Sequence, residues 1–328
     1  MLATSGLLAS ARAGDKRAIA RLLTVVENDA PGAPEILRET FAQTGRALVL
    51  GVTGPPGGGK STLVSRLVGA YRARVARVAV VAVDPSSPFS GGAILGDRIR
   101  MQDRFLDEGV FIRSMASRGH SGGLARTTAR VVAVLDALGT DTVIVETVGV
   151  GQEEIEVVRV VDTVALVTVP GLGDDIQAIK AGVLEIADVL VVNKADRPGA
   201  DETVRDLAQM LSLGPSVRPG RALPAPGGPP SEAWKPPIVR TVAATGDGTD
   251  ELVRAVDRHR AWGRDSGECD RRRADAARVE VEALLRESLV RRLEERVGSA
   301  GVKRAVERVA SREVDPYTAV EELLAKYR

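Results

Sequence analysis

The sequence has little of the chemistry on which several protein classes depend. A single cysteine, Cys269, excludes an intramolecular disulfide framework and suits a reducing compartment, so we expect a cytoplasmic protein. Two histidines give no His-rich metal tract, and a net charge of +1 gives no electrostatic footprint for nucleic acid. No apolar run approaches the roughly 20 residues that cross a bilayer. The first residues also lack the basic region and apolar core of a secretory signal.

What the sequence does contain is a glycine-rich loop between a predicted strand and a predicted helix. Residues 54–61 fit the pattern G-x-x-x-x-G-K-[ST], and an apolar run at 47–53 precedes them. In this pattern Lys60 neutralises the β- and γ-phosphates of a nucleotide, and the Ser61 hydroxyl ligates Mg²⁺. The candidate nucleotide contacts in the loop are Gly54, Pro56, Gly57, Gly58, Gly59, Lys60, Ser61 and Thr62.

A second motif, Asn193-Lys194-Ala195-Asp196, follows another apolar run and indicates which base is bound. The Asp196 carboxylate can accept hydrogen bonds from N1–H and the exocyclic amine of guanine. Adenine lacks this donor pair and would leave the carboxylate unpaired. Asn193 and Lys194 are expected to hold the loop and cover the base. Further along, Ala243, Ala244 and Thr245 fit a loop that supports guanine. The two motifs together predict binding and hydrolysis of GTP to GDP.

Acidic residues at the ends of two other predicted strands point to the metal. Glu146 ends the apolar run 142–146 and can hold a water on Mg²⁺, while the Gly149 N–H can bond the γ-phosphate. Asp84 ends a strand predicted over 78–83, and Asp97 lies in a glycine-punctuated segment. For Asp84 and Asp97 the alternative is a turn or helix-cap role, which is common for aspartate.

The position that follows the switch glycine predicts slow turnover. Signalling GTPases carry there a glutamine that orients the attacking water, whereas this chain has Val150, with Gln152 two residues on. We therefore expect intrinsic GTP hydrolysis to be slow and to rise when a partner or a rearranged switch completes the site.

Several runs together resemble the MeaB/ArgK/MMAA family of SIMIBI-class P-loop GTPases. The resemblance covers about residues 40–265. It implies a chaperone that gates adenosylcobalamin loading and protects or reactivates an acyl-CoA mutase such as methylmalonyl-CoA mutase. A cobalamin adenosyltransferase is a further candidate partner. The runs that carry the resemblance are 51–57, 83–88, 91–98, 146–152 and 193–196.

The resemblance also assigns roles to individual residues. It implies that Asp84, Asp97 and Glu146 serve the metal and its waters. It further implies a mobile segment that relays the nucleotide state to the partner, including Asp174, Asp175, Gln177 and Lys180. By composition alone, that segment is an ordinary loop and helix start.

The pattern of elements predicts three parts. A helical segment at 1–44 includes a helix capped by Asp15. Residues 45–265 alternate strands and helices, which is typical of an α/β P-loop domain with a mostly parallel sheet flanked by helices. A Pro/Gly-rich linker at 214–237 interrupts this domain. The helical extension at 266–328 carries an apolar stripe on a helix expected over 273–297. The stripe could pack on its own domain, but the resemblance favours a homodimer arm.

Three alternatives from other classes remain. An ATP-dependent kinase or transport-associated ATPase needs an acceptor site with its own base, and Asp196 disfavours ATP. A metal-insertion GTPase needs the Cys and His ligands that are scarce here. A nucleotide-dependent scaffold would bind GTP without partner-stimulated turnover.

Overall fold

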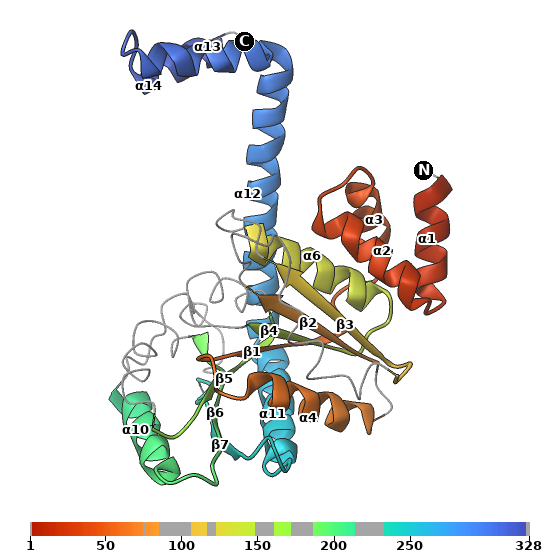
Figure 1. Ribbon diagram of the computed structural model, residues 1–328, viewed down its shortest axis with the longest axis vertical. Helices are drawn as coiled ribbons and strands as arrows, with labels where there is room; N and C mark the ends of the chain where they lie inside the picture. The colour runs from red at the N-terminus through yellow and green to blue at the C-terminus, as the bar shows by residue number, and fades with distance from the viewer. Residues whose placement is uncertain are drawn as a thin grey trace. The chain divides into compact units, whose positions relative to one another are not determined.

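The computed structural model contains a seven-stranded sheet (Figure 1). The structure describes residues 2–74, 77–84, 106–116, 123–147, 161–171, 186–213 and 233–325. The strand order is β3-β2-β4-β1-β5-β6-β7, and every strand pair is parallel. The mostly parallel α/β fold predicted from the sequence is confirmed. The strands are β1 (Leu48–Thr53), β2 (Val78–Asp84), β3 (Val110–Ala116), β4 (Thr142–Thr147), β5 (Thr163–Thr168), β6 (Val189–Asn193) and β7 (Ile238–Thr241).

Helices cover both faces of this sheet, and the strand residues alternate between them. In β6, Val189 and Val191 pack in one core cluster while Leu190 and Val192 pack in another. This two-residue period explains the continuous apolar runs, because a strand covered on both faces buries every side chain. On one face lie α4 (Lys60–Arg72) and α11 (Thr249–Asp265), and on the other lie α6 (Gly123–Ala137) and α10 (Ala200–Leu213) (Figure 1).

The N-terminal helices pack into the same core as α6. The Asp15 carboxylate accepts hydrogen bonds from the N–H groups of Arg17 and Ala18, so it caps α2 as predicted. An additional helix, α1, was not predicted from the sequence, because residues 2–12 are mostly small and show only a weak apolar stripe. The bounds are α1 (Leu2–Arg12), α2 (Lys16–Glu27) and α3 (Ala33–Phe41).

Two buried aspartates connect distant elements at the amino ends of the strands, opposite the end where the glycine-rich loop lies. Near the end of α6, Asp136 accepts hydrogen bonds from the backbone N–H groups of Gly45 and Ala47, at 2.5 and 2.9 Å, and so fixes the entry to β1. Ahead of β6, Asp188 lies 3.3 Å from the imidazole Nε2 of His259 on α11. The Asp136 hydrogen bonds satisfy backbone donors that would otherwise be costly to bury.

The chain divides into two compact units, Met1–Cys269 and Asp270–Arg328. The second unit consists of most of α12 (Glu268–Val297) together with α13 (Ser299–Ala310) and α14 (Pro316–Ala325). The sequence prediction that α12 starts near residue 273 was wrong. The helix begins at Glu268, because Gly267 takes the left-handed φ of 72° that separates it from α11. In this unit Arg308 pairs with Glu313 and Glu322, which links α13 to α14.

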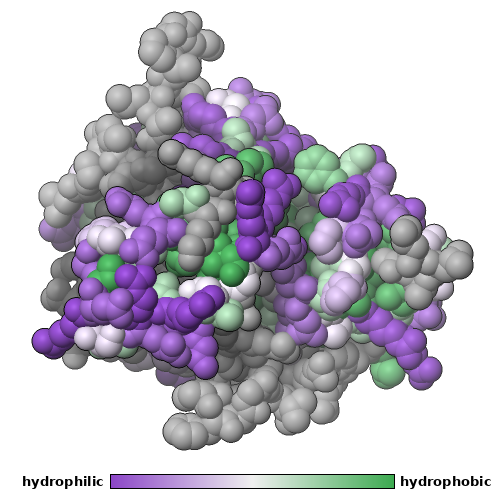
Figure 2. All heavy atoms as spheres, turned by 90° about the horizontal axis from the view of Figure 1, so that it is seen from above, coloured by the Kyte–Doolittle hydropathy of each residue, from purple (hydrophilic) through white to green (hydrophobic). Residues whose placement is uncertain are grey.

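Apolar side chains on α12 are exposed. Val281, Leu284, Leu285 and Leu289 have exposed fractions of 64, 42, 57 and 46 %. Hydrophobic areas occur among hydrophilic ones on the face seen in Figure 2. In the described part of the chain, no helix combines the length and apolar character needed to cross a membrane.

Candidate nucleotide site

The glycine-rich loop connects β1 to α4 and needs glycine for two separate reasons. A Cβ at Gly54 would lie 2.1 Å from the carbonyl oxygen of Val167, so only glycine lets β1 end this close to β5. At Gly59 the φ is 81°, and a Cβ would lie 2.5 Å from the amide nitrogen of Asn193. The loop therefore brings its backbone directly against the end of β6, where the guanine motif begins.

Lys60 is buried within the loop it closes. Its Nζ donates to the carbonyl oxygens of Gly54 and Pro55 at 2.7 and 2.9 Å, and the residue is only 6 % exposed. Anionic oxygens compensate a buried ammonium better than neutral carbonyls do. The arrangement therefore suits a phosphate group in the mouth of the loop.

Ser61 and Glu146, both predicted to serve the metal, meet at the sheet edge. The Ser61 hydroxyl donates to Glu146 Oε1 at 2.6 Å, and both residues are buried. Beside them the hydroxyls of Thr53 and Thr147 lie 2.9 Å apart. A hydroxyl next to a carboxylate is the oxygen donor set that Mg²⁺ prefers.

The backbone of Asp84 lies at the same edge of the sheet. It is the last residue of β2, which runs beside β4 with Val83 opposite Thr147. Its side chain lies outside the described part of the structure. Among the described residues no cluster of three or more His, Cys, Asp or Glu could hold a metal. Mg²⁺ does not require such a cluster, because waters and phosphate oxygens commonly complete its octahedron.

One buried amide joins the phosphate loop to the loops expected around the base. Asn193 Nδ2 donates to the Gly58 carbonyl at 2.8 Å. Its Oδ1 accepts from the Thr241 hydroxyl and the Ala243 N–H, at 3.1 and 3.0 Å. Asn193 therefore links three segments that are far apart in the sequence.

The rest of the guanine motif lies at the surface. Lys194 takes a left-handed φ of 56° and its Nζ donates to the Gly57 carbonyl at 2.8 Å. The Ala195 N–H bonds the Thr241 carbonyl at 3.0 Å, which ties this loop to the end of β7. Asp196 is exposed, so its carboxylate is accessible to a ligand.

One residue near the base loop was not found by sequence reasoning. Arg66, on the outer side of α4, donates from Nε to the Ala243 carbonyl at 2.9 Å and from Nη2 to the Ala244 carbonyl. No motif contains it, since α4 residues beyond Thr62 carry no recognisable pattern except apolar spacing. Only the packing of α4 beside the 243–247 turn brings them together.

Some predicted site residues lie outside the described part of the structure. They are the metal-side and switch residues Asp97 and Gly149, and the relay residues Asp174, Asp175, Gln177 and Lys180. The same holds for residues 214–232 of the predicted linker, while 233–237 lead into β7.

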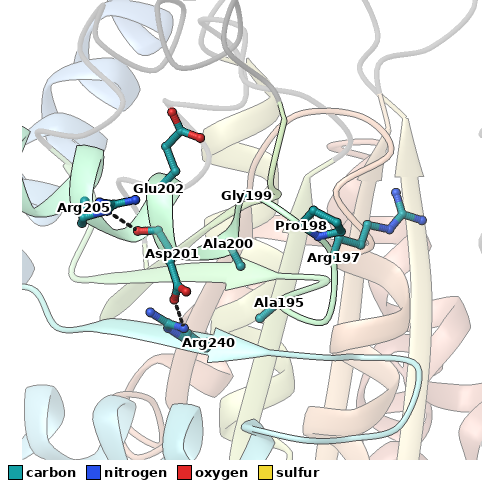
Figure 3. Close-up of a pocket in the computed structure, with 9 residues that line it drawn as sticks. All are labelled: Ala195, Arg197, Pro198, Gly199, Ala200, Asp201, Glu202, Arg205 and Arg240. Carbon is teal, nitrogen blue, oxygen red and sulfur yellow. Dashed lines mark hydrogen bonds and ion pairs between the residues drawn. The ribbon is translucent and has the colours of Figure 1, made fainter.

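A hollow of about 340 Å³ adjoins the guanine motif (Figure 3). Arginines and acids at its wall already interact with one another. The Arg240 guanidinium lies 2.6 Å from the Asp201 carboxylate, and Arg205 Nε donates to the Asp201 carbonyl at 3.3 Å. Because the Asp201 carboxylate pairs with Arg240, it offsets the charge of one wall arginine. Its wall is formed by Ala195, Arg197, Pro198, Gly199, Ala200, Asp201, Glu202, Arg205 and Arg240.

Comparisons with known proteins agree with these observations. A family model described as methylmalonyl Co-A mutase-associated GTPase MeaB matches residues 19–297. A relative from Pyrococcus abyssi, named as a GTPase, is 45% identical over 97% of this chain and 95% of its own length. The GTPase ArgK of Escherichia coli is 44% identical over 56% of this chain and 57% of its own. A crystal structure of a LAO/AO transport system kinase has a TM-score of 0.67 at 26% identity, and the match covers 99% of this chain and 97% of that one.

Proposed function

The chain belongs to the MeaB family of methylmalonyl-CoA mutase-associated GTPases, and on that premise we propose that it is the nucleotide-switched chaperone of an adenosylcobalamin-dependent acyl-CoA mutase. The resemblance drawn from the sequence motifs is thereby confirmed, as is the assignment of the chain as a GTPase. The proposed chaperone gates cofactor loading and protects or reactivates its client. Its nucleotide states are GTP and GDP.

The observation that best supports a guanine nucleotide switch is the set of three hydrogen bonds made by Asn193. This buried amide couples the phosphate loop to the turn that follows β7. A nucleotide bound between them would contact both ends of the same hydrogen-bonded unit. In this proposal Asp196 reads N1–H and the exocyclic amine of the base, and Lys194 covers the base.

Hydrolysis proceeds in this proposal by attack of water on the γ-phosphate. A bound Mg²⁺ would supply positive charge against the charge that develops on the phosphate oxygens. Ser61 and Glu146 would hold the ion and its water, and Lys60 would bind the β- and γ-phosphates. Asp84, Asp97 and Gly149 keep the metal and switch roles predicted for them. Turnover of the isolated protein is slow, since Val150 replaces the usual glutamine.

The proposed partners follow from the family. One proposed segment would relay the nucleotide state to the mutase; it includes Asp174, Asp175, Gln177 and Lys180. A cobalamin adenosyltransferase would supply adenosylcobalamin. The exposed apolar side chains of α12 support a homodimer formed through residues 266–328. The single cysteine fits the reducing cytoplasm as the place of action.

A kinase that uses ATP is the main competing function, since a solved structure of similar fold is described as a transport system kinase. The chemistry of the base site favours guanine. An accessible carboxylate in the 193–196 loop complements two adjacent donors, and adenine presents a ring acceptor there instead.

The client is tested by capture from the native lysate. Tagged protein is loaded with a non-hydrolysable GTP analogue or with GDP, and the bound proteins are identified by mass spectrometry. We expect an acyl-CoA mutase subunit whose recovery depends on the nucleotide and is lost in the matched variant Lys60→Ala. Purified mutase should then raise the GTP turnover rate. Recovery of a nickel enzyme or transporter subunit without any mutase would overturn the chaperone assignment.

A further inference from the structure

The guanidinium of Arg66 holds two consecutive carbonyls of the turn that follows β7. Nε donates to Ala243 O at 2.9 Å, and Nη2 donates to Ala244 O. We propose that Arg66 is a positioning residue for guanine recognition, which orients the Ala244 N–H toward O6 of the base. This inference rests on the proposed guanine site and goes beyond it, because Arg66 belongs to neither nucleotide motif.

The hydrogen bonds of the turn leave one donor available. The Ala243 N–H donates to Asn193, and the N–H groups of Thr245 and Gly246 both donate to the Val242 carbonyl. Within the described ranges, the Ala244 N–H has no hydrogen-bond partner. Ala244 is exposed, so this donor can meet a ligand.

Peptide geometry connects the Arg66 contact to that donor. The Ala243 carbonyl and the Ala244 N–H belong to one planar, trans peptide unit, so they point in opposite directions. When Arg66 binds the carbonyl, it fixes the direction of the N–H on the other side. The contact with the Ala244 carbonyl restrains the next peptide unit in the same way. Together they oppose a flip that would turn a carbonyl toward the base.

The packing around Arg66 is consistent with a fixed side chain. A Cβ built on Gly246, whose φ is 99°, would lie 3.8 Å from Arg66 Cδ, so the arginine stem covers this glycine. Val242 and Asp247 close the turn through the Val242 N–H and the Asp247 carbonyl at 2.9 Å. The turn is thus held at its base by its own backbone and at its tip by Arg66.

The chemistry of the base explains why this donor discriminates. Guanine carries an acceptor, O6, beside its two donors, whereas adenine carries an amine at the equivalent carbon. A fixed N–H opposite that position pairs with guanine and faces a donor in adenine. Arg66 lies about 9 Å along α4 from Lys60. One rigid helix therefore positions both the phosphate end and the base end of the site.

The test compares two nucleotides in wild type and in Arg66→Met, which keeps the stem and removes the donors. One nucleotide is a non-hydrolysable GTP analogue. The other is the matching analogue of 2-aminopurine riboside triphosphate, which keeps the exocyclic amine but lacks O6 and N1–H. We expect Arg66→Met to weaken binding of the GTP analogue about tenfold, as loss of one hydrogen bond implies. The affinity for the second nucleotide should stay unchanged. Arg66→Lys keeps one donor group, so its affinity for the GTP analogue should lie between those of wild type and Arg66→Met.

Two controls make each outcome decisive. Arg74→Gln removes a guanidinium that pairs with Asp257 instead of the turn, and should leave both affinities unchanged. If Arg66→Met weakens both nucleotides equally, or neither, the positioning role of Arg66 is wrong while the guanine site stands. If the wild-type protein binds both nucleotides equally well, the proposed guanine site is wrong, and this inference with it.

Discussion

At the scale of single residues, two glycines of the glycine-rich loop are required for different reasons. One is required only by its backbone conformation, and the other also because a side chain would not fit. Gly57 and Gly59 both take a left-handed φ, 77° and 81°. A Cβ at Gly57 would meet nothing within 4 Å, whereas one at Gly59 would meet the Asn193 amide at 2.5 Å. The pattern G-x-x-x-x-G-K-[ST] does not reveal this difference, because it depends on a side chain from the end of β6.

The matched pair Gly57→Ala and Gly59→Ala tests this reading. Each alanine should cost about 1 kcal/mol of unfolding free energy for the left-handed backbone. Gly59→Ala should in addition displace Asn193 from Gly58 and Ala243, and weaken GTP binding more than tenfold relative to Gly57→Ala. Titration with a fluorescent GTP analogue and thermal unfolding measure the two effects. Equal affinities in both variants would contradict the coupling through Asn193.

At the scale of elements, α4 is held at both ends. Lys60 and Ser61 begin it inside the proposed nucleotide site. At its other end Arg72 donates to the Asp107 carboxylate through Nε and Nη2, both at 2.9 Å. Asp107 also accepts from the Gly109 N–H, and its backbone carbonyl binds Lys16 of α2 at 2.7 Å. Helix α4 is therefore connected to the N-terminal helices through Asp107, which lies before β3.

The Asp107 contact should depend on pH. The hydrogen bonds from Arg72, and then that from the Gly109 N–H, lower the pKa of the Asp107 carboxyl below its ordinary value. A lowered carboxyl pKa gives stability that is present above the unfolded pKa of about 4 and is lost as the pH falls through the folded value. We expect Asp107→Asn to cost about 1 kcal/mol of unfolding free energy at pH 7 and progressively less below about pH 4.

Urea unfolding of wild type and Asp107→Asn, at pH 7 and at a pH below about 4, measures this difference. Asp257→Asn, which removes the partner of the more exposed Arg74, is the matched control and should cost less. A loss for Asp107→Asn that is the same at both pH values would show that its charge contributes nothing.

At the scale of the whole molecule, the division after Cys269 defines a truncation. The helical stretch 270–328 has its own internal contacts, including those of Arg308 with Glu313 and Glu322. The described core clusters of the first unit contain no residue beyond 269. Removing residues 270–328 should thus leave the nucleotide-binding unit folded.

Deletion of residues 270–328 tests the proposed dimer arm. We expect a monomeric mass by light scattering, together with unchanged affinity for a GTP analogue. The physical reason is that exposed valine and leucine side chains on α12 gain stability when a second copy covers them. A dimer that survives the deletion would show that the copies associate through the first unit instead.

Much of the fold follows from local patterns. The apolar runs predicted β1, β2, β4 and β6, because strands covered on both faces are apolar at every position. Strands β3 and β5 were not predicted individually. Helix starts were predicted where a cap is explicit, as at Asp15, and not where residues are small and weakly patterned, as in α1. The start of α12 was misjudged because a single left-handed glycine is enough to separate two helices, and no apolar pattern marks it.

The sequence alone determined the chemistry of the proposed nucleotide site. The spacing in the glycine-rich loop and in the 193–196 motif sets which groups can face phosphate and base, since it depends only on neighbouring residues. The tertiary structure alone decided the contacts of Arg66 with the 243–244 carbonyls, of Asp188 with His259, and of Arg72 with Asp107. These partners lie on different elements, so the packing of the sheet and its helices determines whether they meet, and no short-range pattern records it.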